Sequence, residues 1–280
     1  MQRRKLSSMI ALVAMAAAGL AASPAVAERP AAPTYDRLVL ADDPVGYWPQ
    51  NASGGWRSRE VTRQSPDAVI HGSPTVGRMP NGDKVLVFDG QDDYLEIADS
   101  PTLSPATTGQ FTVEAWMRPD VLVFESSERA GYVHWMGKGE PGQHEWVSRI
   151  YSLDNTAGRE NRISGYLFNL DGGLGAGSYY QEPIEPGQWL HYALVINAEY
   201  SSDAYPEGYT KLYVDGVLVD VDSLVFDGTQ MVPGDGTAPV RVGTRDFGSF
   251  FEGAIGKVAI YDYELAPERI AARVEVMRGQ

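Results

Sequence analysis

A carboxylate and an indole stand two positions apart in a segment whose pattern predicts a β-strand. In residues 111–117, apolar side chains alternate with Thr112, Glu114 and Trp116. Such alternation is typical of a strand that packs on a core with one face only. We therefore expect Glu114 and Trp116 to lie on a face that is open to a ligand or to water. For Trp116, packing in a core is an equally good interpretation.

A second group of candidate residues follows the glycine-containing turn at residues 138–143. His144, Glu145 and Trp146 come directly after this turn, and Arg149 and Tyr151 follow at alternate positions of a predicted strand. Ligand sites commonly combine aromatic side chains with a few polar groups that orient the ligand. The residues expected to bind a ligand are Glu114, Trp116, His144, Glu145, Trp146, Arg149 and Tyr151.

Three aspartates cluster within five residues beside a predicted hairpin turn. They are Asp89, Asp92 and Asp93. Calcium prefers several oxygen ligands, carboxylates among them, whereas aspartates are also common turn formers. Two interpretations therefore stay open, a calcium site and a turn whose acids face solvent. Calcium is the one cofactor that the sequence suggests.

The N-terminal segment has the features of a signal peptide. A basic start is followed by an apolar, alanine-rich stretch and by Ala25-Val26-Ala27, a small-x-small cleavage signal. We expect residues 1–27 to be removed from a secreted, extracellular protein, and residues 28–39 to form a disordered leader. No later stretch is long and apolar enough to predict a membrane span.

Charge and cysteine content exclude several classes of function. The net charge of −14 would become −17 after loss of three basic residues with residues 1–27. An acidic surface repels nucleic acid and anionic lipid; it favours solubility or binding of multivalent cations. The chain has no cysteine, which excludes disulfides, thiol nucleophiles and cysteine-based zinc sites.

Residues 40–280 are predicted to form one all-β domain. About a dozen short strands alternate with turn-rich loops, a pattern typical of an antiparallel two-sheet sandwich. Asp215-Gly216 suits the tight turn of a hairpin. Residues 267–277 carry apolar side chains at helical spacing and predict a short C-terminal helix.

Several short motifs occur together in this region. They are Phe88-Asp89-Gly90, Asp93-Tyr94-Leu95, residues 111–116, Gly187-Gln188-Trp189, residues 212–216 and Ala266-Pro267-Glu268. In this order they resemble laminin G-like domains of the concanavalin A-like lectin/glucanase superfamily, over roughly residues 40–277. The resemblance implies a jelly-roll sandwich whose concave sheet holds a glycan or a protein, often with calcium. Gly256-Lys257 departs from the pattern, because relatives often carry acids there, and a lysine would oppose that calcium site.

The sequence argues against catalysis. Glycosidases need a pair of carboxylates flanking the scissile bond, and relatives place them at alternate positions of one strand, whereas Glu114 stands alone. The Gln-x-His strand of lyases with this fold is absent, and the four histidines fit no metal-ligand motif. His191 lies in a core-type strand and is expected to be structural. We therefore predict a secreted, non-catalytic module that binds extracellular carbohydrate; a glycan-cleaving hydrolase or lyase and a protein-adhesion domain remain the alternatives.

Overall fold

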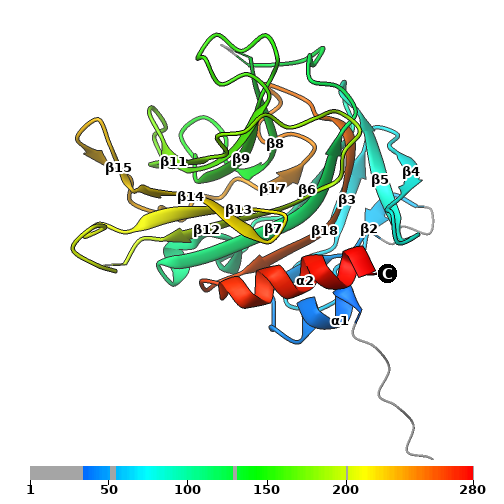
Figure 1. Ribbon diagram of the computed structural model, residues 1–280, viewed down its shortest axis with the longest axis horizontal. Helices are drawn as coiled ribbons and strands as arrows, with labels where there is room; N and C mark the ends of the chain where they lie inside the picture. Colours follow the sequence, from blue (N-terminus) through cyan, green and yellow to red (C-terminus); the bar gives the residue numbers. More distant parts are fainter. Residues whose placement is uncertain (1–33, 51–54, 129–130, 200, 280) are drawn as a thin grey trace, which may run out of the picture. The chain divides into compact units, whose positions relative to one another are not determined.

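The computed structural model describes residues 34–50, 55–128, 131–199 and 201–279, which fold into two packed antiparallel sheets (Figure 1). The expected signal peptide and residues 28–33 of the expected leader lie outside the described residues. The prediction of an all-β jelly-roll sandwich with a C-terminal helix is confirmed.

Sheet A holds eight strands. In spatial order they are β14 (Val217–Ser223), β13 (Tyr209–Val214), β12 (Leu190–Asn197), β7 (Gln110–Pro119), β18 (Glu252–Tyr261), β5 (Lys84–Asp89) and β4 (Thr75–Arg78), and β1 (Gly46–Trp48) pairs with β18. The strand that carries Glu114 and Trp116, β7, lies in the middle of this sheet between β12 and β18.

Sheet B also holds eight strands. Their order is β11 (Ala176–Tyr179), β10 (Arg162–Leu167), β9 (Trp146–Tyr151), β8 (Tyr132–Lys138), β17 (Val240–Val242), β6 (Tyr94–Ile97), β3 (Ala68–His71) and β2 (Arg57–Ser58). Two short strands, β15 (Val225–Phe226) and β16 (Thr229–Gln230), pair with each other, and two 3-10 turns, η1 (Pro101–Leu103) and η2 (Pro105–Thr107), precede β7.

The main core lies between the two sheets and follows the alternation of the strands. Phe111, Val113, Ala115 and Met117 of β7 point into this core, as the sequence predicts, and Trp146 of β9 joins them from sheet B. Because successive side chains of a strand point to opposite faces, each sheet also presents an outer face. The outer face of sheet A is covered by helices, whereas that of sheet B carries a cleft.

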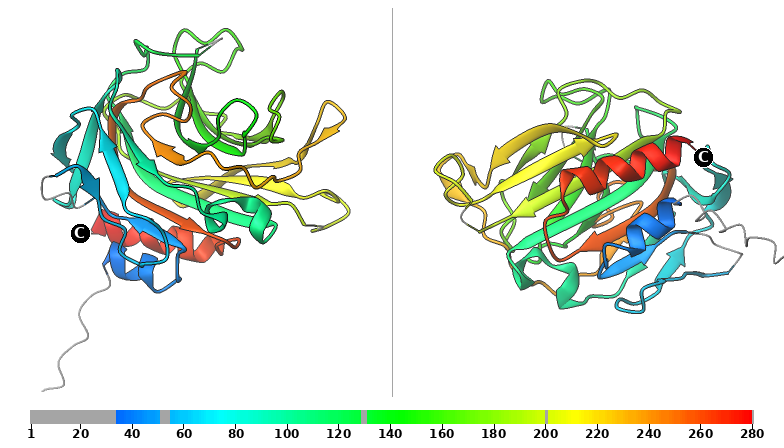
Figure 2. Two further views of the ribbon diagram at one scale, coloured as in Figure 1. Left: turned by 180° about the vertical axis from the view of Figure 1, so that it is seen from behind. Right: turned by 60° about the horizontal axis from the view of Figure 1, so that its bottom comes forward.

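Two helices cover the outer face of sheet A. They are α1 (Tyr35–Leu40) and α2 (Pro267–Gly279), and the right view of Figure 2 shows them lying across the strands of this sheet. Tyr35 and Val39 of α1 and Ile270 of α2 bury their side chains there. The prediction of disorder through residue 39 is therefore wrong from Tyr35 onward, because two apolar residues one helical turn apart bury against the sheet. Among the described residues, no helix combines the length and apolar character needed to cross a membrane.

Candidate functional site

Glu114 and Trp116 do not lie on an open face. Glu114 is fully buried and Trp116 is 2% exposed, because α1 and α2 pack over this side of β7. The rings of Tyr35 and His191 contact the Trp116 ring edge-on, with centroids 6.4 and 5.3 Å away. The expectation that this face meets ligand or water is therefore wrong, and the core interpretation of Trp116 is correct.

Glu114 instead anchors α2 to the sheet. Its Oε1 accepts hydrogen bonds from Arg273 of α2 at 2.8 Å and from the Tyr261 hydroxyl at 2.7 Å. His191, expected to be structural, places Nε2 3.2 Å from Oε2. Burial alone would raise the pKa of Glu114, but Arg273, His191 and Tyr261 outweigh it and lower this pKa to about 2. The carboxylate is held ionised as a structural element.

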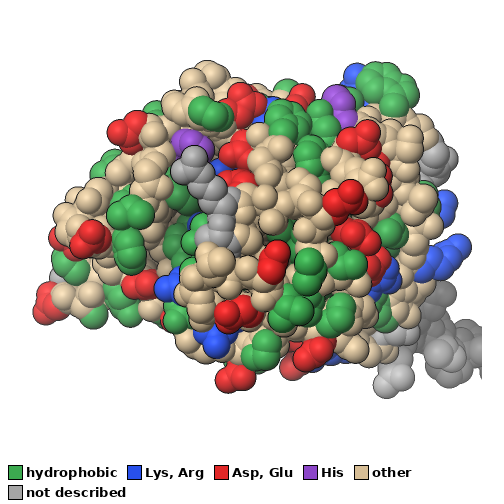
Figure 3. Space-filling model, turned by 90° about the horizontal axis from the view of Figure 1, so that it is seen from above, with side chains coloured by type: hydrophobic (Ala, Val, Ile, Leu, Met, Phe, Trp, Pro, Cys, Tyr) green, Lys and Arg blue, Asp and Glu red, His purple; other side chains and the backbone are tan. Residues whose placement is uncertain are grey.

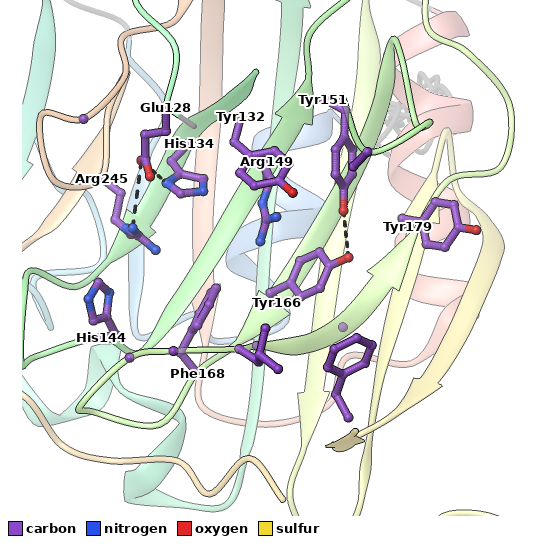
Figure 4. A pocket seen from close by; sticks show the side chains of 18 of the residues that line it. Glu128, Tyr132, His134, His144, Arg149, Tyr151, Tyr166, Phe168, Tyr179 and Arg245 are labelled. Atoms are coloured by element: carbon purple, nitrogen blue, oxygen red, sulfur yellow. Dashed lines mark hydrogen bonds and ion pairs between the residues drawn. The ribbon is translucent and has the colours of Figure 1, made fainter. Parts of the chain in front are cut away.

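The outer face of sheet B carries an open cleft instead of a helix. Its volume is about 830 Å³, and its floor comes from β8, β9, β10 and β11. Three of the residues expected to bind a ligand, His144, Arg149 and Tyr151, line this cleft (Figure 4). On the face of the molecule seen from above, acidic side chains are scattered over the surface (Figure 3).

Strand register explains which residues meet in the cleft. Arg149 of β9 stands opposite His134 of β8 and Ser164 of β10, and Tyr151 stands opposite Tyr132. Directly opposed residues of an antiparallel pair point to the same face. Tyr166 comes two residues after Ser164, so it joins this face as well.

Glu145 and Trp146 do not reach the cleft. Trp146 points into the core, where its ring lies 5.2 Å from Phe111. Glu145 is 1% exposed and forms an ion pair with the buried Lys138. Burial raises the pKa of Glu145 to about 7, although Lys138 partly offsets this effect. These two side chains therefore stabilise the fold, and their assignment to a ligand surface is wrong.

One end of the cleft is built from tyrosines and arginines. Tyr151 and Tyr166 share a hydrogen bond of 2.7 Å, and Arg159 donates to both hydroxyl groups at 3.0 and 2.9 Å. Arg149 lies over the Tyr166 ring at 4.2 Å and over the Tyr132 ring at 4.7 Å. Burial opposes ionisation of Tyr151, but Arg149, Tyr166 and Arg159 outweigh it and lower the Tyr151 pKa. This end combines flat apolar rings with cationic hydrogen-bond donors.

The other end of the cleft is an acid–base cluster. Arg245 pairs with Asp246 at 2.5 Å and lies 3.9 Å from Glu128, which contacts Nδ1 of His134. Burial, with Arg245 and Arg149 nearby, lowers the pKa of His134 well below its ordinary value. Oxygen and nitrogen atoms of Glu128, His134 and Asp246 lie within 4.8 Å of one another. Arg245 compensates the charge of one of the two carboxylates.

A glycine-rich loop walls the cleft beside His144. Gly172 has a φ of +83°, and a Cβ there would come within 2.7 Å of the His144 ring. Only glycine adopts this conformation readily, so its presence lets the loop close onto His144. Leu174 of the same loop also lines the cleft.

The predicted aspartate cluster does form. Carboxylate oxygens of Asp89, Asp92 and Asp93 lie within 4.8 Å of one another. Asp93 accepts backbone hydrogen bonds from Ser73 at 2.5 Å and from Asp89 at 3.1 Å, and Asp89 accepts one from Gln91 at 2.9 Å. These bonds shape the turn without a cation, so the donor set fits calcium but does not require it.

The lysine that departs from the family pattern also has a structural role. Lys257 is fully buried, and its Nζ lies 2.7 Å from both Asp36 of α1 and Asp83. It therefore attaches the first helix to sheet A.

Sequence reasoning missed most of the aromatic lining. The missed residues include Tyr132, Tyr166 and Tyr179, together with Arg159 beside them. Their signal was the alternate spacing of Tyr132 with His134 and of Ser164 with Tyr166. That signal becomes useful only when the pairing of β8, β9 and β10 is known.

The comparisons with known proteins agree with this architecture. The closed sandwich with one helix-covered face and one cleft-bearing face defines a lectin-like β-sandwich. A family model described as concanavalin A-like lectin/glucanases superfamily matches residues 89–271. The chain therefore belongs to this superfamily, within its laminin G-like group, as the sequence motifs predict. None of the curated proteins compared with the chain matches it.

Solved structures of similar fold include domains that bind carbohydrate or protein. Domain 4 of AbnA, an extracellular arabinanase from Geobacillus stearothermophilus in complex with arabinotriose, is 17% identical with a TM-score of 0.57. That match covers 82% of this chain and 98% of the domain.

Two further matches are toxin domains. The ligand-binding domain of botulinum neurotoxin serotype D, in complex with N-acetylneuraminic acid, is 13% identical with a TM-score of 0.59; the match covers 87% of this chain and 53% of that one. The binding domain of botulinum neurotoxin DC, in complex with rat synaptotagmin II, is 13% identical with a TM-score of 0.60, with coverages of 84% and 52%. The chain thus spans about half the length of the toxin domains, and at these identities the likeness shows the fold alone.

Proposed function

We propose that this protein is a secreted, non-catalytic module that binds carbohydrate in the cleft on the outer face of sheet B. The observation that carries the proposal is the tyrosine floor of that cleft. Tyr132, Tyr151, Tyr166 and Tyr179 all line one cavity of about 830 Å³. Such a volume is of the size that encloses small ligands.

The chemistry of the cleft suits a sugar. Tyrosine rings offer flat apolar surfaces for the C–H faces of a sugar ring, while their hydroxyl groups donate and accept hydrogen bonds. Arg159 adds further donors at the rim, since it is half-buried beside Tyr151 and Tyr166. Sheet strands rather than loops hold most of these side chains, which favours a preformed site.

The similar structures support a binding role in general terms. The arabinanase domain was solved with arabinotriose and one toxin domain with N-acetylneuraminic acid. Secretion is proposed from the signal-peptide features of residues 1–27.

A glycan array followed by calorimetry tests this proposal. We expect the full chain to bind at least one oligosaccharide, and Tyr166→Ala to weaken that binding strongly. Tyr205→Ala removes a tyrosine that does not line the cleft and serves as the matched control. If no oligosaccharide binds, while a protein from culture supernatant or cell wall does, the adhesion alternative replaces this proposal.

One observation favours a second candidate, a glycan-cleaving enzyme. Carboxylate oxygens of Glu128 and Asp246 lie within 4.8 Å of each other in the cleft, and retaining glycosidases likewise bring two carboxyl groups close together, at about 5 to 5.5 Å. The pairing of Arg245 with Asp246 at 2.5 Å makes this arrangement less suited to acid catalysis. Release of reducing ends from a polysaccharide panel, abolished in Glu128→Gln, would establish this activity.

A further inference from the structure

Four arginines are buried among the described residues, and they differ in whether a carboxylate pairs with them. They are Arg149, Arg241, Arg245 and Arg273, each at most 7% exposed. Arg273 pairs with Glu114 and Asp42. The other two paired arginines, Arg241 and Arg245, have carboxylate partners within 2.5 to 2.9 Å.

Arg149 has no such partner. Within the described residues, no carboxylate lies at ion-pair distance from Arg149, and its Nε is buried without a hydrogen bond. Its visible neighbours are the rings of Tyr132, Tyr151 and Tyr166. Tyrosine rings attract a guanidinium but do not neutralise it.

Arg159, in the loop that precedes β10, has a similar arrangement. Its guanidinium lies 3.9 Å from the centre of the Tyr179 ring and, within the described residues, donates hydrogen bonds to the hydroxyl groups of Tyr151 and Tyr166 alone. None of the ion pairs seen in the described parts of the chain involves it. Two arginines without acidic partners therefore border one tyrosine-lined space.

Burial of an unpaired charge is unfavourable because the group loses its hydration. In a protein with a net charge of −14, acids to pair with it are plentiful, and the three other buried arginines have them. The missing partner is best explained by a ligand that supplies it. Guanidinium groups bind carboxylate and sulfate with two parallel hydrogen bonds.

We infer that the bound saccharide is acidic and that Arg149, assisted by Arg159, holds its anionic group. This inference rests on the proposed function, since it names the class of sugar that the same cleft binds. The cleft also contains Glu128, Asp246 and Asp222. The first two contact Arg245 or His134 at the opposite end, and they would disfavour an anion there. Asp222 interacts electrostatically with Arg159 without forming an ion pair, so the acidic group of the ligand is placed at the tyrosine end and beside Arg149 in particular.

The test compares charged and neutral forms of the same sugar. Trigalacturonic acid and its methyl ester differ by the carboxylates, and a sulfated carrageenan tetrasaccharide and its desulfated, neutral form differ by sulfate. Calorimetry with the full chain at low and at physiological salt gives each affinity. We expect one acidic form to bind about 10- to 100-fold more tightly than its neutral counterpart, with the difference shrinking as salt rises. The pair that shows the effect tells whether the group is a carboxylate or a sulfate.

Variants assign the effect to the arginines. Arg149→Gln and, separately, Arg159→Gln are expected to remove most of the preference for the acidic form, with the loss larger for Arg149. Arg57→Gln is the matched control, because Arg57 also stacks on an aromatic ring, Trp56, at 4.2 Å but lies outside the cleft. Circular dichroism and the unfolding temperature check that each variant is folded; Arg159 is half-buried, so its variant remains informative if Arg149→Gln does not fold.

The outcomes separate this inference from the proposed function. Equal affinity for acidic and neutral forms, or a preference that survives both substitutions, overturns the inference and leaves the carbohydrate site standing. If only neutral sugars bind, the inference is likewise overturned and the carbohydrate site still stands. Absence of binding to every saccharide on the array overturns both.

Discussion

The two outer faces of the sandwich start from the same pattern and end differently. On sheet A, Glu114 and Trp116 alternate with core residues and are sealed beneath α1 and α2. On sheet B, Arg149 and Tyr151 alternate with core residues in the same way and line an open cleft. Alternation therefore identifies an outer face of a sheet. Whether that face is covered or open to a ligand depends on the packing of segments distant in the sequence.

The two faces also differ in whether their buried arginines are paired with carboxylates. Arg273 comes from α2 and meets Glu114 and Asp42, so the covered face carries its own counter-charges. Arg149 on the open face contacts tyrosine rings and has no carboxylate partner within the described residues. The first arrangement stabilises the fold, and the second is available to a ligand.

The largest expected effect is a loss of stability caused by a substitution on the covered face of sheet A. Glu114→Gln removes the fully buried one of the two carboxylates that pair with Arg273 and leaves only Asp42. Loss of one partner of a buried pair costs about 3 to 5 kcal/mol in the free energy of unfolding. Urea denaturation followed by circular dichroism measures this loss. The exposed Glu185→Gln is the control and is expected to change stability by less than about 0.5 kcal/mol. An unchanged affinity for saccharide in folded Glu114→Gln is also expected, and a loss of binding would contradict the division between the faces.

The next effect concerns the open face. Tyr166→Ala removes an aromatic surface and the hydrogen bonds to Tyr151 and Arg159. We expect saccharide affinity to fall by about 2 kcal/mol, or about 30-fold, as is usual for a buried anchor residue. Calorimetry against the Tyr205→Ala control measures the difference. Similar affinities for the two variants would contradict binding of the saccharide in the cleft.

Acid pH should weaken the covered face selectively. The Glu114 pKa is lowered from its ordinary value near 4.5 to about 2 in the folded protein. A lowered carboxyl pKa contributes stability that is complete above the unfolded-state value and is lost as pH falls through the folded-state value. The stability difference between the wild type and Glu114→Gln should therefore shrink between pH 4.5 and 2. Denaturation curves at several pH values test this, and a constant difference would contradict the assigned role of the ion pair.

The smallest effect is expected from calcium. Asp89 and Asp93 already accept backbone hydrogen bonds, and neither aspartate lines the cleft. We expect calcium at about 1 mM to raise stability by less than about 1 kcal/mol, and EDTA to leave saccharide affinity unchanged. A large thermal shift that disappears in Asp89→Asn would instead establish a tight calcium site in this loop.

The strand pattern predicted the sandwich because alternation, turn residues and the terminal helix are local properties. The β7 core face, the Asp215-Gly216 hairpin and the helix at α2 follow from neighbouring residues alone. The covering of Glu114 could not be predicted locally, because its partner Arg273 lies 159 positions away.

The cleft was predicted only in part for the same reason. His144, Arg149 and Tyr151 come from one stretch and were found together. Tyr166 and Arg159 come from the next strand and its preceding loop, and their place depends on the register of β9 with β10. Glu145 and Trp146 were misassigned because their aromatic and acidic character suits a core and a site equally well.

The central claim is that the ligand binds over β8, β9 and β10 and not at the strand that carries Glu114. A structure of the full chain with the tightest saccharide from the glycan array tests it most directly. We expect electron density for the sugar against Tyr151 and Tyr166, with an acidic group within hydrogen-bond distance of Arg149. A sugar bound elsewhere on the protein, with the tyrosine cleft empty, would contradict it.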